Sequence, residues 1–396
     1  MKAVILAAGE STRTYPLTST RPKALLEIAN KPVLQHNLEA LDGLVDEALI
    51  VVGYRKEMIK ERFGSGFRGI KITYIEQKQR LGTGHAVLSA RDHLKGSFIV
   101  ENGDDIYSRG LLEKCLSHEV CVVARRVKDP RAFGVWLENS GNVSGFAEKP
   151  GSFVSDLANT GLYVLHDSIF GEIRKLKRSI RGEYELNEAV NSLSSKRKIP
   201  VVKADGGWMP ICYSWDLLDA NEAILQGLKE PRIEGEVEEN VKIKGPVIIG
   251  KGTLVRSGAY IEGPVIIGED CVIGPNCYIR PFTSVGNRCR VGNGAEIKNS
   301  ILMDGSKVNH LSYVGDSVLG YGVNIGGGNM MANLRHDGEN VKSFVKGNCI
   351  DTQRRKFGTV IGDNAKTGAG TLVYPGRKIW PGRTTLPGEH VKADKM

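Results

Sequence analysis

Two patterns of hydrophobic residues divide the chain. In the first pattern, apolar runs typical of β-strands alternate with helical segments, as at residues 3–9 and 97–104. Alternating β and α segments build a mostly parallel sheet covered by helices. Ligands of such a sheet bind in the crevice at the carboxyl ends of the strands, where Gly9, Gln77 and Asp104 fall. We therefore expect an α/β, Rossmann-like domain with its site at that edge.

The second pattern is a repeat of six residues that begins at Val237. Val or Ile occupies every sixth position from there until Met303 ends the series, and glycine follows many of them. Such a period is typical of a parallel β-helix, in which each coil has three short strands and the repeated side chains stack inside. After an irregular insertion at about 329–358, the phase returns from Ile361. The predicted organisation is an α/β domain at 1–228, a linker at 229–235 and a β-helix at 236–396.

The six-residue rhythm stops after Met303. The next position of the repeat is Asn309, and His310 stands beside it. We interpret the break as an interior layer given up so that the fold presents an imidazole at a cleft between coils. The alternative is a polar residue that only fills the stack.

Composition indicates a globular protein of the cytoplasm. The chain has 396 residues, of which 41% are hydrophobic and 25% charged. Its seven cysteines form no Cys-x-x-Cys pair, which indicates reduced thiols and argues against a zinc site. The apolar run MKAVILAAG is too short for a signal peptide or a membrane span. The net charge of +9 is scattered without aromatic–basic interleaving, so we expect small phosphorylated substrates and neither nucleic acid nor membrane as partner.

The segment LAAGESTRTYPLTSTRPKALLEI follows the first strand. A turn whose backbone N–H groups converge can cradle a triphosphate, and Arg13 and Lys23 can neutralise the charge that develops in nucleotidyl transfer. The segment resembles the signature of sugar-1-phosphate nucleotidyltransferases, and the resemblance extends through the first domain. It implies nucleotide contacts at Ala8 and Gly9 and catalytic roles for Arg13 and Lys23. Ser11 replaces the second glycine of the usual Gly-x-Gly-x-Arg, and a plain strand–turn–helix connector is the alternative.

The segment EQKQRLGTGHAV resembles the base-reading motif of the uridyltransferases in this family. The resemblance implies that the amide of Gln77 pairs with the pyrimidine while Gly82 and Thr83 lie against it. A glutamine amide offers one donor and one acceptor, which suits uracil and thymine equally, so the choice of UTP over dTTP rests on the resemblance. Asp104, at a strand end in ENGDDIY, would hold the Mg²⁺ that bridges the substrate phosphates.

Motifs farther along match the sugar-phosphate contacts of the family. The residues that the resemblance assigns to this subsite are Gly134, Glu148, Lys149, Asn159 and Thr160. One position departs from the pattern, because Pro210 stands where such enzymes often carry a second metal-binding aspartate. Proline cannot ligate a metal, so Asp104 would anchor Mg²⁺ with help from UTP and water.

Motifs in the predicted β-helix resemble, in order, the acetyltransferase half of the bifunctional glucosamine-1-phosphate acetyltransferase/N-acetylglucosamine-1-phosphate uridyltransferases. They are IRPFTSVG, AEIKNS, HLSYVGD and GVNIGGG. The resemblance implies a left-handed β-helix, a homotrimer and His310 as the general base, which takes a proton from the sugar amine as it attacks acetyl-CoA. The sugar-phosphate contacts that it implies are Arg280, Lys298, Tyr313 and Asn324. The acetyl-CoA contacts that we expect are Gly327, Thr367, Arg354 and Arg355, with a solvated basic loop as the alternative at the two arginines.

The whole chain thus resembles an archaeal-type bifunctional enzyme of UDP-N-acetylglucosamine synthesis. The expected reactions are acetyl transfer from acetyl-CoA to glucosamine 1-phosphate, or to galactosamine 1-phosphate, and then Mg-dependent uridylyl transfer from UTP. In the second reaction a phosphate oxygen attacks the α-phosphorus of UTP in line and needs no general base, because it is already an anion. The alternatives are a glucose-1-phosphate thymidylyltransferase-like enzyme, an acetyltransferase with a weakened nucleotidyltransferase site, and a non-catalytic subunit, against which His310 argues.

Overall fold

The chain folds into two compact units, which are described separately. The computed structural model describes residues 1–396, with the side chain of Ala132 left aside. The first unit consists of Met1–Glu10, Pro22–Leu25 and Val33–Pro210, and the second of Ser11–Arg21, Leu26–Pro32 and Ile211–Met396. Part of the N-terminal signature segment, Ser11–Arg21, is therefore grouped with the second unit.

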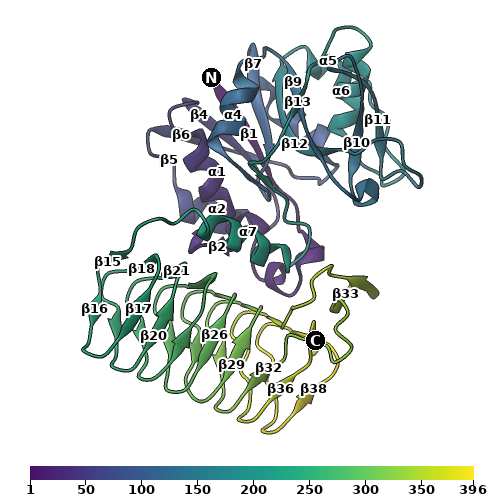
Figure 1. Cartoon of the computed structure of the whole chain (residues 1–396). Helices are drawn as coiled ribbons and strands as arrows, with labels where there is room; N and C mark the ends of the chain where they lie inside the picture. Colours follow the sequence, from purple (N-terminus) through teal and green to yellow (C-terminus); the bar gives the residue numbers. More distant parts are fainter. The chain divides into compact units, whose positions relative to one another are not determined.

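The first unit is built on a ten-stranded mixed sheet (Figure 1). Its main path runs β11-β10-β12-β7-β1-β4-β6-β5, with β9 and β13 joined beside β12. The strands are β1 (Lys2–Ala7), β4 (Glu47–Val52), β5 (Gly66–Phe67), β6 (Ile70–Glu76), β7 (Ser97–Asn102), β9 (Cys121–Arg126), β10 (Gly134–Asn139), β11 (Asn142–Glu148), β12 (Leu157–His166) and β13 (Val201–Lys203). A separate two-stranded ribbon pairs β8 (Ile106–Tyr107) with β14 (Trp208–Met209).

Helices cover both faces of this sheet. They are α1 (Val33–Leu41), α2 (Lys56–Phe63), α3 (Thr83–Ser89), α4 (Arg109–Leu116), α5 (Ile169–Ile173) and α6 (Leu186–Ser194), with short 3-10 turns at Lys23–Leu25, Arg91–His93 and Pro130–Ala132. Successive residues of a strand point to opposite faces, so Ile5 of β1 joins one core with α1, α2 and α4, while Val4 joins the other with α3, α5 and α6. Strands β7, β1, β4 and β6 run parallel, which confirms the predicted α/β domain.

The second unit contains the predicted left-handed parallel β-helix (Figure 1). Val247 pairs with Val265, one coil of three six-residue sides later, and both side chains are fully buried. The first sheet holds β15 (Arg232–Ile233), β18 (Val247–Ile249), β21 (Val265–Ile267), β24 (Thr283–Val285), β27 (Ile301–Leu302), β30 (Val318–Leu319), β35 (Val360–Ile361) and β37 (Lys378–Ile379). The second holds β16 (Glu236–Val237), β19 (Leu254–Val255), β22 (Val272–Ile273), β25 (Arg290–Val291), β28 (Lys307–Val308) and β31 (Asn324–Ile325). The third holds β17 (Lys242–Lys244), β20 (Tyr260–Glu262), β23 (Tyr278–Ile279), β26 (Glu296–Lys298), β29 (Tyr313–Gly315), β32 (Met330–Met331), β36 (Leu372–Val373) and β38 (His390–Val391).

The break in the six-residue rhythm has a different cause from the one predicted. Val285 pairs with Leu302, and the stack then continues through Val308 without a gap, because all three side chains are fully buried. One side of the coil is therefore a residue shorter, and the phase moves forward by one place. Asn309 lies just outside the buried ladder and replaces no interior layer, so that part of our interpretation was wrong. The shorter corner passes through Asn299, whose φ of 44° lies in the left-handed region that asparagine tolerates.

The irregular insertion forms a small hairpin on the β-helix. Strands β33 (Lys342–Val345) and β34 (Asn348–Asp351) pair in antiparallel fashion. Lys378, which is 2% exposed, donates from Nζ to the carbonyl of Phe344 at 2.7 Å. Burial lowers the pKa of this lysine to about 8. The hairpin is thus tied to β37 through a nearly enclosed amine.

Helix α7 (Asp216–Leu225) also belongs to the second unit. Asn221 accepts from the N–H of Ala29 at 2.9 Å and from the hydroxyl of Ser284 at 2.5 Å, and it donates to the carbonyl of Phe282 at 2.9 Å. Ala29 lies between β2 (Glu27–Ile28) and β3 (Lys31–Pro32), a two-stranded ribbon. One buried amide therefore joins the helix, the ribbon and the first sheet of the β-helix.

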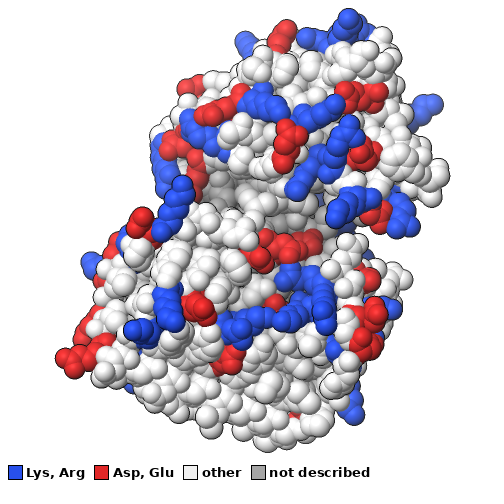
Figure 2. Space-filling view, in the orientation of Figure 1, with Lys and Arg blue, Asp and Glu red and all other residues white. Residues whose placement is uncertain are grey.

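Charged side chains are mixed over the face of the molecule that Figure 2 shows. Lys and Arg lie among Asp and Glu there. Among the helices of residues 1–396, none is long and apolar enough to cross a membrane. The predicted lack of a nucleic-acid partner stays a prediction.

Candidate active sites

A buried lysine and an aspartate meet at the predicted edge of the first sheet. Leu6 near the end of β1 pairs with Asn102 at the end of β7, so the turns after these strands lie side by side. Lys23 donates from Nζ to Oδ2 of Asp104 at 2.9 Å, and its side chain is only 6% exposed. Asp105 lies 4.0 Å from the same amine. The structure thus brings together Lys23 and Asp104, as the sequence predicts.

The donor set around Asp104 is small. Within residues 1–396, as far as side chains are described, no cluster of three His, Cys, Asp or Glu residues could hold a metal ion. Pro210 directly follows β14, whose partner β8 comes just after Asp104, and it offers no ligand. Mg²⁺ commonly keeps several waters and binds through one or two carboxylates together with substrate phosphates. The partly exposed carboxylate of Asp104 fits a magnesium ion that is held mainly by substrate phosphates and water. It does not fit an ion enclosed by several protein ligands.

Gln77 is held in one orientation at the end of β6. Its amide nitrogen donates to the carbonyl of Gly82 at 3.0 Å and lies 3.1 Å from Nδ1 of His85. Gly82 has a φ of 93°, and a Cβ there would lie 2.8 Å from the carbonyl oxygen of Tyr184. The hydroxyl of Thr83 accepts from the N–H of Leu186 at 3.1 Å and so caps the start of α6. Gly82 therefore lets this loop lie against Tyr184, and Thr83 fastens the loop to the first residue of α6.

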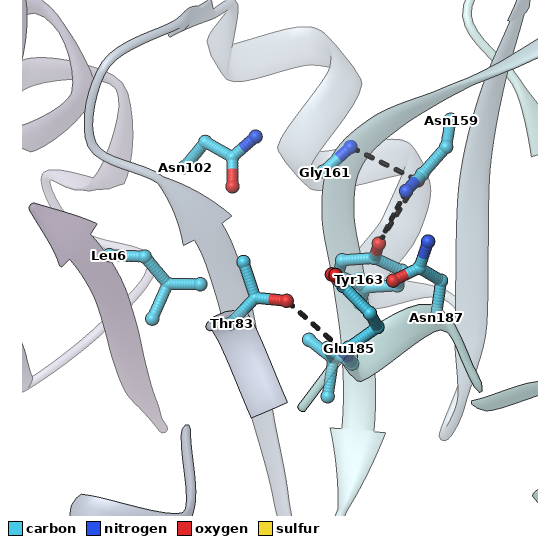
Figure 3. A pocket seen from close by; sticks show the side chains of 9 residues that line it. Leu6, Thr83, Asn102, Asn159, Gly161, Tyr163, Glu185 and Asn187 are labelled. Atoms are coloured by element: carbon cyan, nitrogen blue, oxygen red, sulfur yellow. Dashed lines mark hydrogen bonds between the residues drawn. The ribbon is translucent and has the colours of Figure 1, made fainter. Parts of the chain in front are cut away.

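A small polar cavity lies beside this loop (Figure 3). Its volume is about 150 Å³, and Figure 3 shows Asn102, Thr83 and Asn159 around it. The side-chain oxygen of Asn159 accepts from the N–H of Gly161 at 3.1 Å, and the amide also bonds to the hydroxyl of Tyr163 at 2.7 Å. The full lining is Leu6, Thr83, Asn102, Asn159, Gly161, Tyr163, Glu185, Leu186 and Asn187. Asn159 is thus placed and oriented at a cavity, as expected of a ligand contact.

Thr160 is placed differently from its neighbour. It is fully buried, and its hydroxyl donates to the carbonyl of Val123 at 3.0 Å. The same oxygen accepts from the N–H of Leu162 at 3.3 Å. Its side chain holds the bend of β12, and a ligand contact from this residue would have to come from its backbone.

A larger cavity of about 690 Å³ is lined by two more of the predicted sugar-phosphate residues. Glu148 and Lys149 line it, and it shares Glu185 and Asn187 with the smaller cavity. Arg181 lies 3.2 Å from Glu148 and 2.8 Å from Glu185. The sequence reasoning missed Arg181, Glu185 and Asn187, because they follow a basic stretch without a motif and become neighbours of Glu148 only in the fold.

Gly134 explains how Glu148 reaches this cavity. The two residues are register partners at the ends of β10 and β11. A Cβ on Gly134 would lie 2.3 Å from Cζ of Phe146 and 2.8 Å from a carboxylate oxygen of Glu148. Since real Cβ atoms do not approach other atoms that closely, only glycine leaves these side chains where they are.

Arg13 belongs to the second unit, in the 3-10 turn Thr12–Thr14. Its guanidinium lies 5.8 Å from the centre of the Tyr213 ring. Ser11, which replaces the expected glycine, has a φ of 53°. The serine therefore adopts the left-handed conformation that glycine takes more easily, and the turn is kept despite the substitution.

In the β-helix, His310 follows β28 at an exposed corner. Its carbonyl accepts from the N–H of Gly328 at 3.0 Å and from the hydroxyl of Ser312 at 2.7 Å. A Cβ on Gly327 would lie 3.5 Å from Cβ of His310. The imidazole therefore stands on a fixed backbone next to the glycine-rich turn that contains Gly327.

A polar cluster lies on the third sheet of the β-helix. Lys298 contacts Asp316 at 3.1 Å, and Asp316 accepts from the amide of Asn333 at 2.5 Å. The same amide donates to the hydroxyl of Tyr313 at 3.0 Å, and burial raises the pKa of that phenol. Lys298 and Tyr313 are thus joined through two residues, Asp316 and Asn333, that the sequence reasoning did not assign to the site.

The remaining predicted contacts of the β-helix are more scattered. Arg280 pairs with Glu296 at 2.8 Å. Arg280 directly follows β23, which lies two strands before β29 and its Tyr313 in the third sheet. The hydroxyl of Thr367, which is buried, accepts from the N–H of Gly326 at 3.1 Å. Asn324 is half-buried in β31, Arg354 bonds to Asp219 of α7, and Arg355 is exposed. Arg354 therefore has a partner within its own chain, whereas Arg355 faces solvent.

Comparison with known proteins agrees with the two-part organisation. A family model described as nucleotidyl transferase matches residues 2–227, and one described as the GMPPB C-terminal domain matches residues 261–385. The chain is 42% identical over 386 residues to the "Bifunctional protein GlmU" of Methanococcus vannielii, covering 96% of this chain and 92% of that protein. It is 39% identical over 400 residues to a "Bifunctional sugar-1-phosphate nucleotidylyltransferase/acetyltransferase" of Sulfurisphaera tokodaii, covering 100% of this chain and 98% of that one.

Solved structures match the nucleotidyltransferase part. One from Bacillus anthracis, of the glucose-1-phosphate thymidylyltransferase type, is 27% identical with a TM-score of 0.53, and the match covers 59% of this chain and 98% of that chain. The family model spans more than half of the chain, and the archaeal relatives span nearly all of it. The chain therefore belongs to the nucleotidyl transferase family, and within it to the bifunctional GlmU proteins.

Proposed function

We propose that this protein catalyses acetyl transfer from acetyl-CoA to glucosamine 1-phosphate and then uridylyl transfer from UTP to the N-acetylated product. Galactosamine 1-phosphate is a second acceptor in this proposal. The observation that carries it is the presence of two separate sets of reactive groups in one chain. Lys23 meets Asp104 at the edge of the first sheet, and His310 stands beside Gly327 in the β-helix.

The nucleotidyl step depends on positioning and charge. A phosphate oxygen of the sugar 1-phosphate attacks the α-phosphorus of UTP, the bond to the β-phosphate oxygen breaks, and pyrophosphate leaves. Lys23 supplies a buried positive charge at the sheet edge, and Arg13 supplies a second from the signature segment. Enzymes of this type generally use a divalent metal, and we propose Mg²⁺ at Asp104, where it would neutralise phosphate charge.

The larger cavity suits a sugar 1-phosphate because it carries both signs of charge. Glu148 and Glu185 offer oxygens that accept hydrogen bonds from sugar hydroxyls. Lys149 and Arg181 offer cations for the phosphate. Its volume of about 690 Å³ lies within the range of sites that hold small organic ligands.

The acetyl step uses the exposed imidazole. The amine nitrogen attacks the thioester carbonyl, its proton passes to the ring of His310, and the bond from the carbonyl carbon to the CoA sulfur breaks. Lys298 supplies a cation within the polar cluster for the sugar phosphate. Arg280 is placed on the same sheet for the same purpose.

Two assays test the proposal. Pyrophosphate release from UTP with N-acetylglucosamine 1-phosphate reports the first activity, and CoA release from acetyl-CoA with glucosamine 1-phosphate reports the second. We expect both activities in the purified chain. Absence of both would refute the proposal.

Pro210 favours one alternative, in which the chain only transfers acetyl groups. The lack of a cluster of three possible metal ligands among the described side chains supports this alternative. The variant Pro210→Asp distinguishes the two cases. If pyrophosphate release appears only in the variant, the acetyltransferase-only alternative holds.

A relative named glucose-1-phosphate thymidylyltransferase, from Streptomyces antibioticus, is 37% identical over 267 residues. It favours dTTP as an alternative nucleotide. Competition between UTP and dTTP at equal concentration, read out by the ratio of the two sugar nucleotides, decides which is preferred. We expect the uridine product to dominate.

We also propose a homotrimer in the cytoplasm. Leu311 and Leu386 expose 71% and 73% of their surface on the β-helix, which is unusual for large apolar side chains unless another chain covers them. All seven cysteines are free thiols, which fits a reducing compartment. Light scattering coupled to gel filtration tests the trimer, and a monomeric mass would exclude it.

A further inference from the structure

The signature segment Ser11–Arg21 is a folded loop in its own right. The hydroxyls of Thr14 and Thr18 both donate to the carbonyl of Ser11, at 2.7 and 2.8 Å. Leu17 and Thr18 are fully buried in the loop, and Thr14 is 1% exposed. The loop is therefore stiff inside, and whatever holds its two ends decides where Arg13 points.

The C-terminal end of this loop is held by the β-helix. Arg21 contacts Asp363 at 2.5 Å, and the side chains are only 14% and 7% exposed. Thr20 donates its hydroxyl proton to the same carboxylate oxygen at 2.8 Å. The guanidinium of Arg21 lies 3.5 Å from the centre of the Tyr321 ring. Charge-assisted bonds of this kind are strong when water is excluded, so the anchor is a specific one.

Asp363 is fixed in turn by the lattice of the β-helix. Its second oxygen accepts from the N–H of Tyr321 at 3.0 Å. Gly320 leaves room for this contact, because a Cβ there would lie 2.5 Å from the same oxygen. The carboxylate therefore cannot move without disturbing the turn between two coils.

The N-terminal part of the loop has a second support. Arg13 lies over Tyr213, whose ring stacks on Trp215 with a centroid distance of 4.5 Å and an angle of 13°. Trp215 is 3% exposed and meets the edge of Phe357, which is fully buried, at 5.8 Å. Three aromatic rings thus form a rigid backing for the guanidinium.

We propose that Asp363 and Tyr321 are positioning residues for nucleotidyl transfer, although they belong to the β-helix. This inference rests on the proposed function of Arg13. Catalysis by positioning and charge requires a guanidinium held within a fraction of an ångström, and loops achieve this only when their supports are rigid. The β-helix supplies that rigidity at Asp363 and, through Phe357, at Arg13.

The variant Asp363→Asn tests the proposal, and Asp304→Asn is its matched control. Asp304 accepts from the N–H of Asn287 at 2.7 Å in a corresponding turn of the β-helix, and its other oxygen meets the exposed Arg288 at 3.2 Å. Both variants keep a side-chain oxygen that can accept the backbone N–H of the turn. Only Asp363→Asn removes the negative charge that holds Arg21. Arg21→Met removes the same pair from the loop's side and serves if Asp363→Asn does not fold.

We expect Asp363→Asn to speed hydrogen exchange of the amides in residues 11–21 and to lower kcat for pyrophosphate release by about tenfold or more. Acetyl transfer by the same protein should stay within about twofold of the Asp304→Asn value. Equal exchange in the two variants would overturn the proposal. A loosened loop with unchanged kcat would overturn it as well.

A wild-type chain that releases no pyrophosphate would be a failure of the proposed function and not of this inference. The comparison then uses the Kd of UTP from calorimetry on the full chain. Weaker UTP binding in Asp363→Asn alone supports the positioning role, and equal Kd values in the two variants refute it.

Discussion

Glu101 lies next to the last residue of β7, and its carboxylate has no hydrogen-bond partner among the described residues. It pairs through its backbone with Ile5 of β1, and its side chain is fully buried. Burial without compensation disfavours the charged form and raises the pKa of this carboxyl from 4.5 to about 8.

This raised pKa makes the stability of the first unit depend on pH. Between pH 4.5 and 8 the unfolded chain loses the proton of Glu101 while the folded chain keeps it, so stability falls as pH rises. At 1.36 kcal/mol for each pH unit, the gap corresponds to about 5 kcal/mol in full. Most of that change, about 3 kcal/mol, lies between pH 5 and 8.

The variant Glu101→Gln keeps the shape of the side chain and removes its titration. We expect the difference in unfolding free energy between the variant and the wild type to grow in the variant's favour by about 3 kcal/mol from pH 5 to pH 8. Urea unfolding followed by hydrogen exchange at β1 and β7 reads this difference for the first unit alone. A difference that stays flat across this range would refute the reasoning, because it would mean that Glu101 is charged or partnered in the folded protein.

Three further predictions concern the candidate sites. His310→Ala should abolish CoA release and leave pyrophosphate release and the thermal midpoint unchanged, because the imidazole is exposed; a lowered midpoint would instead show a structural role. Gly134→Ala should raise KM for the sugar 1-phosphate and cost about 1–3 kcal/mol of stability, since its Cβ would meet Phe146, and calorimetry together with steady-state kinetics would detect both effects. Ser11→Gly should leave kcat unchanged and stabilise the chain by up to about 1 kcal/mol in denaturant unfolding, because glycine adopts a φ of 53° without strain; destabilisation would contradict this.

Periodic features of the fold could be predicted from the sequence because they depend on local repetition. The stacking of Val247 on Val265 follows from spacing alone. The position of the shorter side could not be predicted in this way, because it depends on the backbone of a corner residue, Asn299. Counting in steps of six assigns Met303 to the interior ladder, whereas Leu302 occupies that place in the structure.

The candidate sites show the same division. Asp104 could be predicted because it lies just after the end of β7, and Lys23 because it belongs to the signature segment that follows β1. Asp316 and Arg181 could not, because their importance comes from contacts with Lys298 and Glu148 that no local motif records. The grouping of α7 with the β-helix likewise depends on bonds between residues far apart in the chain.

The shorter side of the coil changes the spacing of residues along the β-helix without interrupting its buried core. The interior ladder passes from Val285 to Leu302 without a gap, and inward and outward side chains alike move by one place relative to the six-residue count after the corner. A single deletion at such a corner can therefore change the residues of the corner itself at little cost in buried area. In evolution, this would let a surface site such as the one around His310 be rebuilt by changes of length as well as by substitution, while the core remains intact.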